Sequence, residues 1–392
     1  MSRRSFLVRT GAGIGALGLI DPGLRAVAQT FAQTNAGTGN LLVLCQLNGG
    51  MDALSFLAPH TNAAYQAKRP LLALGAADVT PLPGRPEYGI TNHCDFFSEL
   101  YGLGQCAIVQ QVAYPNGNGS HFESQEIYEY GVRNLSSATG TSARWYERLR
   151  KTYFDEPFGV MDTAKTGDPR SFGYPDTTYR HAAQHAFGRY ARMKAGATRT
   201  EKAMLDTYAR IDEISQQLRD STQAFTSTGA ARGEFWRAAA IASANLGTQI
   251  LKVSYGGFDT HGSQNEANAT LFPRLNNEFR QFKDDLVALG LWDRTTVVFY
   301  TEFGRRNEEN GSPGTDHGYA GHMILCGPRV NGGLHGQNVT TADINQPNLP
   351  YYVDFRGVFS QCIQTWLGFN PTPIFSIDNE TFDSNVGSAL FR

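Results

Sequence analysis

Residues 249–262 have the sequence QILKVSYGGFDTHG, in which a predicted strand leads directly to two candidate metal ligands. The first seven residues contain a β-branched and aliphatic run, and a helical pattern begins near Gln264. In open α/β sheets, ligands bind beyond the carboxyl ends of the strands. Asp259 and His261 are two residues apart, so in an extended segment both side chains point to the same side and could bind one ion. The alternative is that Asp259 caps a turn and His261 packs on a neighbouring side chain.

The same layout occurs earlier in the chain. The apolar run Leu41–Leu47 predicts a central strand that is covered on both faces. It is followed by Asn48-Gly49-Gly50-Met51-Asp52, so a glycine pair again precedes a carboxylate at a strand end. Asp52 is therefore a further candidate ligand. The alternative is that Asp52 caps the segment that follows it.

A serine at a predicted helix start is the candidate nucleophile. The predicted strand 106–112 precedes a turn rich in glycine and asparagine and then Ser120-His121-Phe122-Glu123. Ser120 and Glu123 have the spacing of a capping box, which predicts that Ser120 caps a helix running to about Tyr130. The same position lies in positive potential, where an oxyanion binds and a bound metal could activate the hydroxyl. His121 is a candidate ligand or substrate contact.

Two further predicted strands are flanked by ionisable residues. The run 295–301 is followed by Glu302 and Arg305. A guanidinium suits a planar anion with several oxygens, and pairing of Arg305 with Glu302 is the alternative. His317 precedes the strand 323–327. The fold could gather these residues into one mixed oxygen and nitrogen site, with three carboxylates and two imidazoles from Asp52, Asp259, His261, Glu302 and His317. This donor set suits one or two Zn²⁺ or Mn²⁺ ions, and suits Mg²⁺ or Ca²⁺ less well.

The alternation of strands and helices predicts an α/β fold with a doubly wound, mainly parallel sheet and helices on both faces. We assign residues 41–392 to this domain. Residues 143–235 combine Pro/Gly-rich segments with helical stretches, which predicts a helical cap insertion. A chain of 392 residues can bury a large core, as one domain with an insertion or as two domains.

The N-terminus predicts export. The pattern is typical of a twin-arginine signal peptide. It consists of the paired arginines Arg3 and Arg4, a weakly apolar run over residues 10–20 and small residues at Ala26 and Ala28. We assign residues 1–28 to this signal and 29–40 to a linker. The apolar run is too short and too rich in glycine for a membrane anchor. The mature protein is thus expected in the periplasm or outside the cell, and not as an integral membrane protein.

Charge and cysteine content set further bounds. The 34 basic and 36 acidic residues become 30 and 35 after signal removal, which leaves a net charge of −5 and gives no indication of a nucleic-acid partner. The five cysteines show no paired metal-ligand spacing. Cys45, Cys106 and Cys326 lie in strand-like runs, where buried thiols are expected. An oxidising compartment would permit one disulfide, but the sequence does not select the pair.

Taken in order, these segments resemble domain-of-unknown-function family 1501, exported bacterial proteins that are similar to the alkaline phosphatase and sulfatase superfamily. The resemblance extends from Leu41 to about Leu367 and rests on LNGGMD at 47–52, SHF at 120–122, GFDTHG at 257–262, TEFGR at 301–305 and TDHG at 315–318. It implies an alkaline-phosphatase-like fold. It also implies Ser120 as nucleophile and, as metal ligands, Asp52, Asp259, His261, Glu302 and His317.

The function implied by this resemblance is metal-dependent hydrolysis of small anionic esters of phosphate or sulfate. Arg305 is then expected to stabilise the anionic transition state. The chain contains no Cys-x-Pro-x-Arg segment, so a formylglycine-dependent sulfatase is not expected. The alternative function is that of a non-catalytic exported protein that keeps the fold for binding or envelope assembly.

Overall fold

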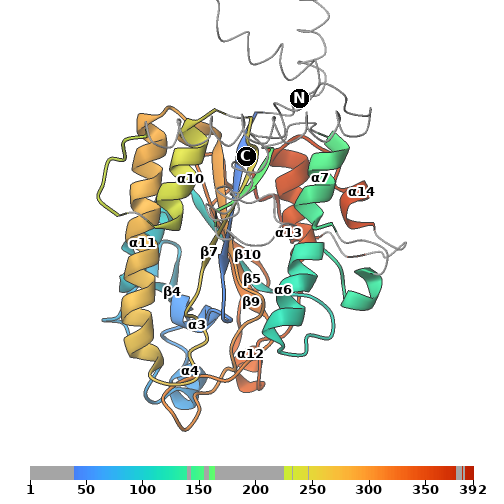
Figure 1. Cartoon of the computed structure of the whole chain (residues 1–392). Coiled ribbons are helices and arrows are strands. Elements are labelled where there is room, and N and C mark those ends of the chain that lie inside the picture. The colour runs from blue at the N-terminus through green and yellow to red at the C-terminus, as the bar shows by residue number, and fades with distance from the viewer. Residues whose placement is uncertain are drawn as a thin grey trace, which may run out of the picture.

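The chain folds around one large sheet (Figure 1). The computed structural model describes residues 39–138, 143–153, 159–163, 225–231, 233–245, 247–376, 382 and 385–392. Within these ranges the sheet has eight strands in the order β10-β5-β9-β8-β1-β7-β6, and β11 pairs with β5. The strands are β1 (Leu41–Leu47), β5 (Cys106–Ala113), β6 (Val160–Asp162), β7 (Ile250–Tyr255), β8 (Thr295–Tyr300), β9 (Gly321–Cys326), β10 (Gly333–Gly336) and β11 (Val353–Asp354).

Most neighbouring strands of this sheet are parallel. β1 pairs in parallel with β7 on one side and β8 on the other. The pairings of β6 with β7, and of β10 and β11 with β5, are also parallel. β9 runs antiparallel to both β5 and β8. The prediction of a mainly parallel sheet is confirmed, and the predicted strands at 41–47, 106–112, 249–255, 295–301 and 323–327 agree with the observed bounds to within two residues.

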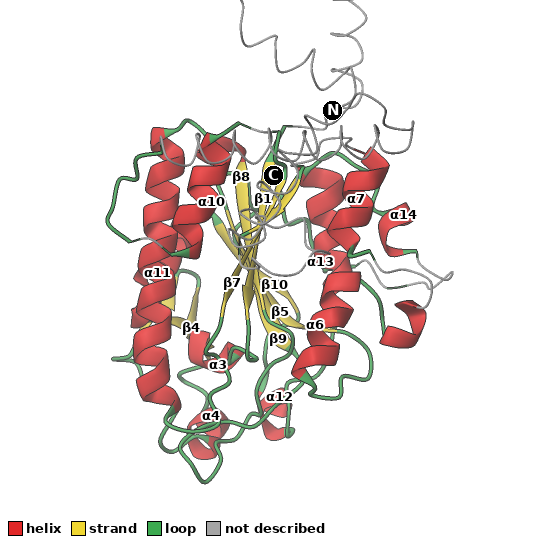
Figure 2. Ribbon diagram, in the orientation of Figure 1, coloured by secondary structure: helices red, strands yellow, loops and turns green. Residues whose placement is uncertain are grey.

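Helices cover both faces of the sheet, as predicted (Figure 2). They are α3 (Ala53–Phe56), α4 (Ala63–Lys68), α5 (Asp95–Gly102), α6 (His121–Tyr130), α7 (Trp145–Tyr153), α10 (Glu234–Ser243), α11 (Gln264–Ala288), α12 (Thr341–Asn345), α13 (Phe355–Gln361) and α14 (Thr372–Phe375). Short 3₁₀ turns are η2 (Asn92–Cys94), η3 (Leu135–Ala138) and η5 (Trp292–Arg294), and the π-helical turn η6 (Cys362–Trp366) follows α13. A second, antiparallel sheet comprises β2 (Leu57–Ala58), β4 (Arg85–Thr91) and β3 (Val79–Leu82).

The position of β1 between two layers of helices explains why its sequence is continuously apolar. Val43 and Cys45 belong to the core cluster that includes Phe279 of α11. Leu42 and Leu44 belong to the cluster on the other face, together with residues of α6, α7 and α13. Every residue of β1 is buried. A strand covered on both faces needs apolar side chains at successive positions rather than at alternate ones.

The predicted cap insertion begins inside the α/β domain. Trp145 and Leu149 of α7 pack in the core on one face of the sheet, and β6 extends the sheet beside β7. Both elements lie within the predicted range 143–235, so its first part belongs to the main domain. Residues 164–224, which hold most of the predicted cap, lie outside the described residues. Residues 1–38, with the predicted signal peptide and most of the predicted linker, also lie outside them.

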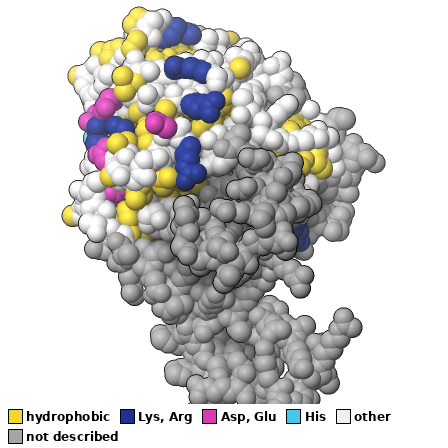
Figure 3. Space-filling model, turned by 90° about the horizontal axis from the view of Figure 1, so that it is seen from above, with side chains coloured by type: hydrophobic (Ala, Val, Ile, Leu, Met, Phe, Trp, Pro, Cys, Tyr) yellow, Lys and Arg dark blue, Asp and Glu magenta, His cyan; other side chains and the backbone are white. Residues whose placement is uncertain are grey.

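The carboxyl ends of β1, β7 and β8 lie at one edge of the sheet, which is the lower edge in Figure 1. Leu47 is in register with Tyr255, and Gln46 with Tyr300, so the segments that follow these strands emerge together. Figure 3 looks onto the opposite end of the molecule, where Lys and Arg side chains are dispersed over the described surface.

The structure also describes the cysteines and the helices long enough to be compared with membrane spans. All five cysteines are described, and each is a free, buried thiol. Among the described helices, none combines the length and apolar character needed to cross a membrane.

Candidate metal centre

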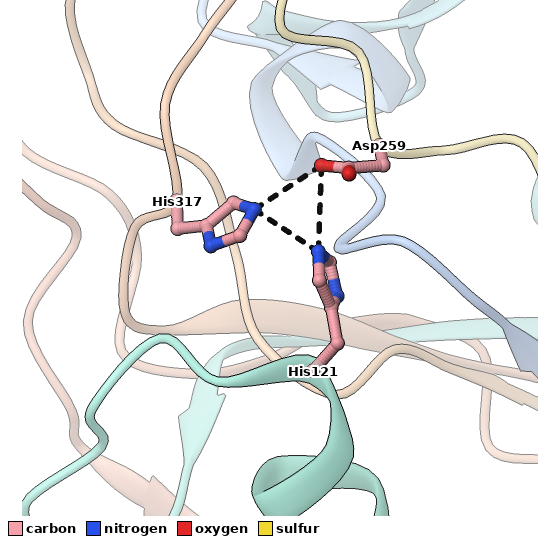
Figure 4. Close-up of side chains that lie close together, drawn as sticks. All are labelled: His121, Asp259 and His317. Atoms are coloured by element: carbon pink, nitrogen blue, oxygen red, sulfur yellow. Dashed lines mark hydrogen bonds and ion pairs between the residues drawn. The ribbon is translucent and has the colours of Figure 1, made fainter.

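Three side chains meet at the carboxyl edge of the sheet (Figure 4). His121 is the first residue of α6, Asp259 follows β7, and His317 lies in the loop before β9. His121 Nε2 is 3.0 Å from His317 Nε2 and 3.4 Å from Asp259 Oδ1. The distance from His317 Nε2 to Asp259 Oδ1 is 3.1 Å. Two imidazole nitrogens and a carboxylate oxygen therefore converge on one point, and we call these three residues the cluster.

The partners on the side away from the cluster indicate the tautomer of both imidazoles. His121 Nδ1 lies 2.7 Å from Glu302 Oε1, and His317 Nδ1 lies 2.8 Å from the carbonyl oxygen of Gly119. A carboxylate or carbonyl oxygen can only accept, so each Nδ1 carries a proton and donates it. In the neutral imidazole, each Nε2 then keeps its lone pair directed at the cluster. This is the arrangement by which metal-binding histidines are commonly oriented.

His261 adds a third imidazole at the side of the cluster. Its Nε2 is 2.9 Å from His317 Nε2 and 3.1 Å from Asp259 Oδ1. Its Nδ1 lies 3.3 Å from Asp316 Oδ1 and donates to that carboxylate. The side chains of Asp259 and His261 thus lie on the same side of the segment, as predicted. The His261 side chain is 45% exposed, so it forms the solvent side of the site.

Glu302 lies behind His121 and is completely buried. Its Oε1 accepts hydrogen bonds from His121 Nδ1, from the backbone N–H of Gly49 at 2.8 Å and from Gln125 Nε2 at 3.1 Å. Its Oε2 accepts from the hydroxyl of Thr301. The structure therefore places Glu302 as the group that orients His121, whereas the sequence analysis expected a direct metal ligand.

Arg305 is also buried, and its guanidinium is used within the protein. It donates to the carbonyl oxygens of Gly50 and Thr315 at 2.8 Å each, to that of Phe258 at 3.1 Å and to that of Gly49. It also donates to Asp259 Oδ1 at 2.6 Å. The partner of Arg305 is thus Asp259 and not Glu302. We correct the expected contact with a substrate anion, because these internal acceptors hold the side chain below the surface.

Asp259 remains ionised in these surroundings. Partial burial raises the pKa of its carboxyl, but the hydrogen bond and positive charge of Arg305, together with the neighbouring His317, outweigh this effect and lower the pKa to about 2. The side chain is 49% exposed. An ionised carboxylate is thus available to a cation at neutral pH.

Asp52 lies outside the cluster, in contrast to the expectation that it would be a ligand. Arg69 donates to both of its oxygens, with the shorter distance 2.5 Å, and Ser55 and Gln264 donate to Oδ2 at 2.6 and 2.7 Å. Oδ1 accepts from the backbone N–H of Leu54, which makes Asp52 the N-cap of α3. Burial raises the pKa of Asp52, but Arg69 and these hydrogen bonds outweigh it and lower the pKa below its ordinary value. The capping alternative is confirmed, and both oxygens are occupied by protein donors.

Ser120 caps α6, as the capping-box spacing predicted. Its Oγ accepts from the backbone N–H of Glu123 at 3.4 Å. The residue lies between Gly119, whose carbonyl holds His317, and His121 of the cluster. Ser120 is therefore adjacent in the chain to two groups of the site. Its role as nucleophile stays a prediction.

Close backbone contacts bring the segments of the site together. Gly49 has φ +115°, and a Cβ added there would lie 2.3 Å from the backbone nitrogen of Asp259. A Cβ at Gly314 would lie 2.3 Å from the carbonyl carbon of His261. These two glycines allow the segments after β1 and before β9 to approach the segment after β7.

The donor set fits a divalent transition metal. Four-coordinate zinc with nitrogen and oxygen ligands at 2.0–2.1 Å has ligand atoms roughly 3.3–3.4 Å apart. The separations within the cluster are 3.0, 3.1 and 3.4 Å. Imidazole suits Zn²⁺ and other transition ions, whereas Mg²⁺ and Ca²⁺ prefer oxygen ligands. The residues that would hold one ion are His121, Asp259 and His317, with His261 beside them.

Several residues of the site were missed or given another role by sequence reasoning. His121 was predicted as catalytic, with metal binding as an alternative, and it lies in the cluster. Asp316 was not singled out, although it stands directly before His317 in the segment TDHG. Arg69 and Gln264 carry no local pattern that connects them to the site. A pattern search could have found Asp316, but only the fold reveals the other two.

Fold and site together define an α/β protein with a candidate metal centre at the carboxyl edge of its main sheet. The sequence matches the model of a family described as a protein of unknown function, DUF1501, over residues 170–351. This range includes Asp259, His261, Glu302, Arg305 and His317. The segments 47–52 and 120–122 lie outside it, so the match is narrower than the resemblance inferred from the sequence motifs. A comparison with curated proteins gives no match.

Several solved structures are similar to the chain at low identity. A lipoteichoic acid synthase from Listeria monocytogenes has 10% identity over 76% of this chain and 68% of its own, with a TM-score of 0.37. A putative sulfatase from Bacteroides fragilis has 12% identity over 88% and 76%, with a TM-score of 0.35. A phosphonate monoester hydrolase of Agrobacterium radiobacter has 10% identity over 88% and 78%, with a TM-score of 0.34. This similarity is too low to transfer an activity to the chain.

Proposed function

We propose that the protein is an exported metal-dependent hydrolase of phosphate or sulfate esters, similar in fold and chemistry to the alkaline phosphatase and sulfatase superfamily. The observation that carries the proposal is the convergence of His121 Nε2, His317 Nε2 and Asp259 Oδ1 within 3.4 Å of one another. A divalent cation among these atoms would be attracted both by the ionised carboxylate and by the imidazole lone pairs. We propose Zn²⁺ or Mn²⁺ as this cation, as one or two ions, ahead of Mg²⁺ or Ca²⁺.

The metal would polarise the ester and lower the pKa of the attacking hydroxyl or water. The chain's own groups would bind and orient the substrate. The first N–H groups of the ten-residue helix α6 lie beside the cluster, and a helix N-terminus favours an anion. Ser120, at the start of the same helix, is the proposed nucleophile. Glu302 and the Gly119 carbonyl hold His121 and His317 in their orientations.

Export remains part of the proposal. The paired arginines, weakly apolar run and small-residue site in residues 1–28 support delivery to the periplasm or the medium by the twin-arginine pathway. A fusion of residues 1–40 to a reporter that is active only after folded export would test this. Replacement of Arg3 and Arg4 by Lys should abolish export of the fusion, and unchanged export would refute the assignment.

The first test of the metal site is metal content. Mature protein purified without chelators should hold about one or two equivalents of transition metal by elemental mass spectrometry. The Asp259→Ala, His261→Ala double variant should lose most of this metal and stay folded. A wild-type protein that is folded and takes up no metal from Zn²⁺ or Mn²⁺ would refute the metallohydrolase proposal.

A second candidate function is metal-dependent binding without catalysis. The observation that favours it is the burial of Arg305, which has the protein's own carbonyls and Asp259 as acceptors. A screen with aryl phosphates, phosphodiesters and aryl sulfates over several divalent metals separates the two functions. Turnover that disappears in Asp259→Ala supports the hydrolase, whereas metal binding without turnover of any of these esters supports the binding protein.

A further inference from the structure

A buried amide connects Asp52, which lies outside the cluster, to the two segments that carry most of the site. Gln264 is the first residue of α11 and is completely buried. Its Nε2 donates to Asp52 Oδ2 at 2.7 Å and to Ser55 Oγ at 3.1 Å. Its Oε1 accepts from the hydroxyls of Thr260 at 3.1 Å and Thr315 at 2.6 Å.

The orientation of this amide is determined by charge. Asp52 is ionised and bound by Arg69, so it can only accept, and the NH₂ end of Gln264 must face it. The oxygen of Gln264 must therefore face the two threonines. Buried polar networks in which every member has a partner hold a single geometry, because each alternative leaves a buried group without a hydrogen bond.

The two threonines lie within the site's own segments. Thr260 stands between Asp259 and His261, and Thr315 is two residues before His317. Both are buried, and the backbone N–H of Thr315 donates to the carbonyl oxygen of Thr260 at 3.1 Å. One amide oxygen thus joins the segment after β7 to the segment before β9, at the positions from which the side chains of the cluster project.

We propose that Gln264 is a positioning residue for the metal centre, and that Asp52 acts on the centre through Gln264 rather than by binding metal. Arg69 anchors Asp52, Asp52 orients Gln264, and Gln264 sets the relative positions of Asp259 and His317 through Thr260 and Thr315. The proposal rests on the proposed metal site. Its consequence is that metal affinity depends on a side chain that touches neither the metal ligands nor the solvent.

The test compares two buried amides of the same helix. Gln264→Met removes the amide below the site. Asn276→Leu is the matched control, because Asn276 is also buried in α11, accepts from the backbone N–H of Phe96 and donates to the carboxylate of Asp95. Zinc affinity is measured by competition with a chromophoric chelator, and the stability of the metal-free proteins by urea unfolding.

We expect Gln264→Met to weaken zinc binding by roughly 10–100-fold, the usual effect of losing a group that orients ligands. Asn276→Leu should lose stability while keeping wild-type affinity.

Threonine variants separate positioning from general loss of packing. Thr315→Val and Thr260→Val remove the hydroxyls at almost constant size and should weaken zinc binding, whereas Thr315→Ser and Thr260→Ser keep the hydroxyl and should retain it. Amide hydrogen exchange of the metal-free protein gives a second readout, with faster exchange in segments 259–261 and 315–317 in Gln264→Met and not in Asn276→Leu.

The outcomes distinguish this proposal from the proposed function. If the wild type binds zinc and Gln264→Met binds it equally well, or if Asn276→Leu weakens binding as much, the positioning role is refuted and the metal site stands. If the wild type binds no zinc, the metal site itself is refuted.

Discussion

Asp52 and Asp259 follow a similar local pattern, in which two glycines, one apolar residue and the carboxylate come just after a parallel strand, with Asn48 as one extra residue in the first case. Their surroundings are opposite. The side chain of Asp52 is 3% exposed and paired with Arg69. That of Asp259 is 49% exposed and lies among three imidazoles and Arg305. In both cases the pattern places a carboxylate at the carboxyl edge of the sheet. The segments that pack around that carboxylate determine whether it stabilises the fold or is available to bind a cation.

The largest effect that would test this contrast is on stability. Asp52→Asn should lower the free energy of unfolding by about 3–5 kcal/mol, because Arg69 would stay charged and buried without a carboxylate. Asp259→Asn should cost no more than about 2 kcal/mol, because this carboxylate is half exposed to water and Arg305 keeps its four backbone carbonyl acceptors. Urea unfolding of the metal-free proteins at pH 7 measures both. Equal losses in the two variants would remove the distinction between a structural and a functional carboxylate.

The second prediction concerns the buried imidazole of His322. His322 in β9 is buried, and burial lowers its pKa from 6.5 to about 4. The folded protein therefore favours the neutral ring, and the unfolded chain binds the proton first as the pH falls. Stability that is fully present above pH 6.5 should be lost between pH 6.5 and about 4, by roughly 3 kcal/mol. Urea unfolding at pH 7 and pH 4.5 measures the loss. His322→Asn, whose Oδ1 can accept from the Gln111 N–H in place of Nδ1, should lose less over this interval. The same pH dependence in both proteins would contradict the assignment.

The two carboxylates that orient imidazoles differ in the same way. Glu302, which holds His121, has no exposed side-chain surface, and Asp316, which holds His261, is 53% exposed. Glu302→Gln should weaken zinc binding by about 10-fold and Glu302→Ala by about 100-fold, within the range usual for groups that orient ligands. Asp316→Asn should change the affinity less, because water can replace the carboxylate. Chelator competition measures all three, and a larger effect from Asp316 than from Glu302 would show that burial does not decide which carboxylate matters more for metal binding.

The smallest expected effect concerns Ser120. Ser120→Ala should cost about 1 kcal/mol in stability through loss of the α6 cap. Ser120→Asn should keep the stability, because asparagine caps helices as well as serine does. If the hydroxyl is the nucleophile, both variants lose ester hydrolysis. Hydrolysis that survives in Ser120→Asn would limit Ser120 to its role as a cap.

Much of the fold could be predicted from local patterns. The strands β1, β5, β7, β8 and β9 and the start of α11 follow from apolar runs and helical spacing, since strands covered on both faces need continuous apolar sequence. The antiparallel direction of β9 and the small sheet of β2, β3 and β4 were not predicted. Strand direction depends on how a connection crosses the sheet, and short strands give little periodicity to detect.

The candidate site divides in the same way. The sequence alone determined that Asp52, Asp259 and Glu302 would reach one edge of the sheet, because parallel strands deliver the residues after them to the same side. His317 precedes β9 and reaches this edge because β9 runs antiparallel, which only the structure shows. Only the tertiary structure decided their roles. Asp52 forms a buried ion pair with Arg69. Glu302, an expected ligand, accepts from His121 Nδ1 and orients that ring. Arg305 donates to carbonyl oxygens from three segments. The physical reason is that a side chain's role is determined by its partners in space, and these partners come from segments up to 256 positions away.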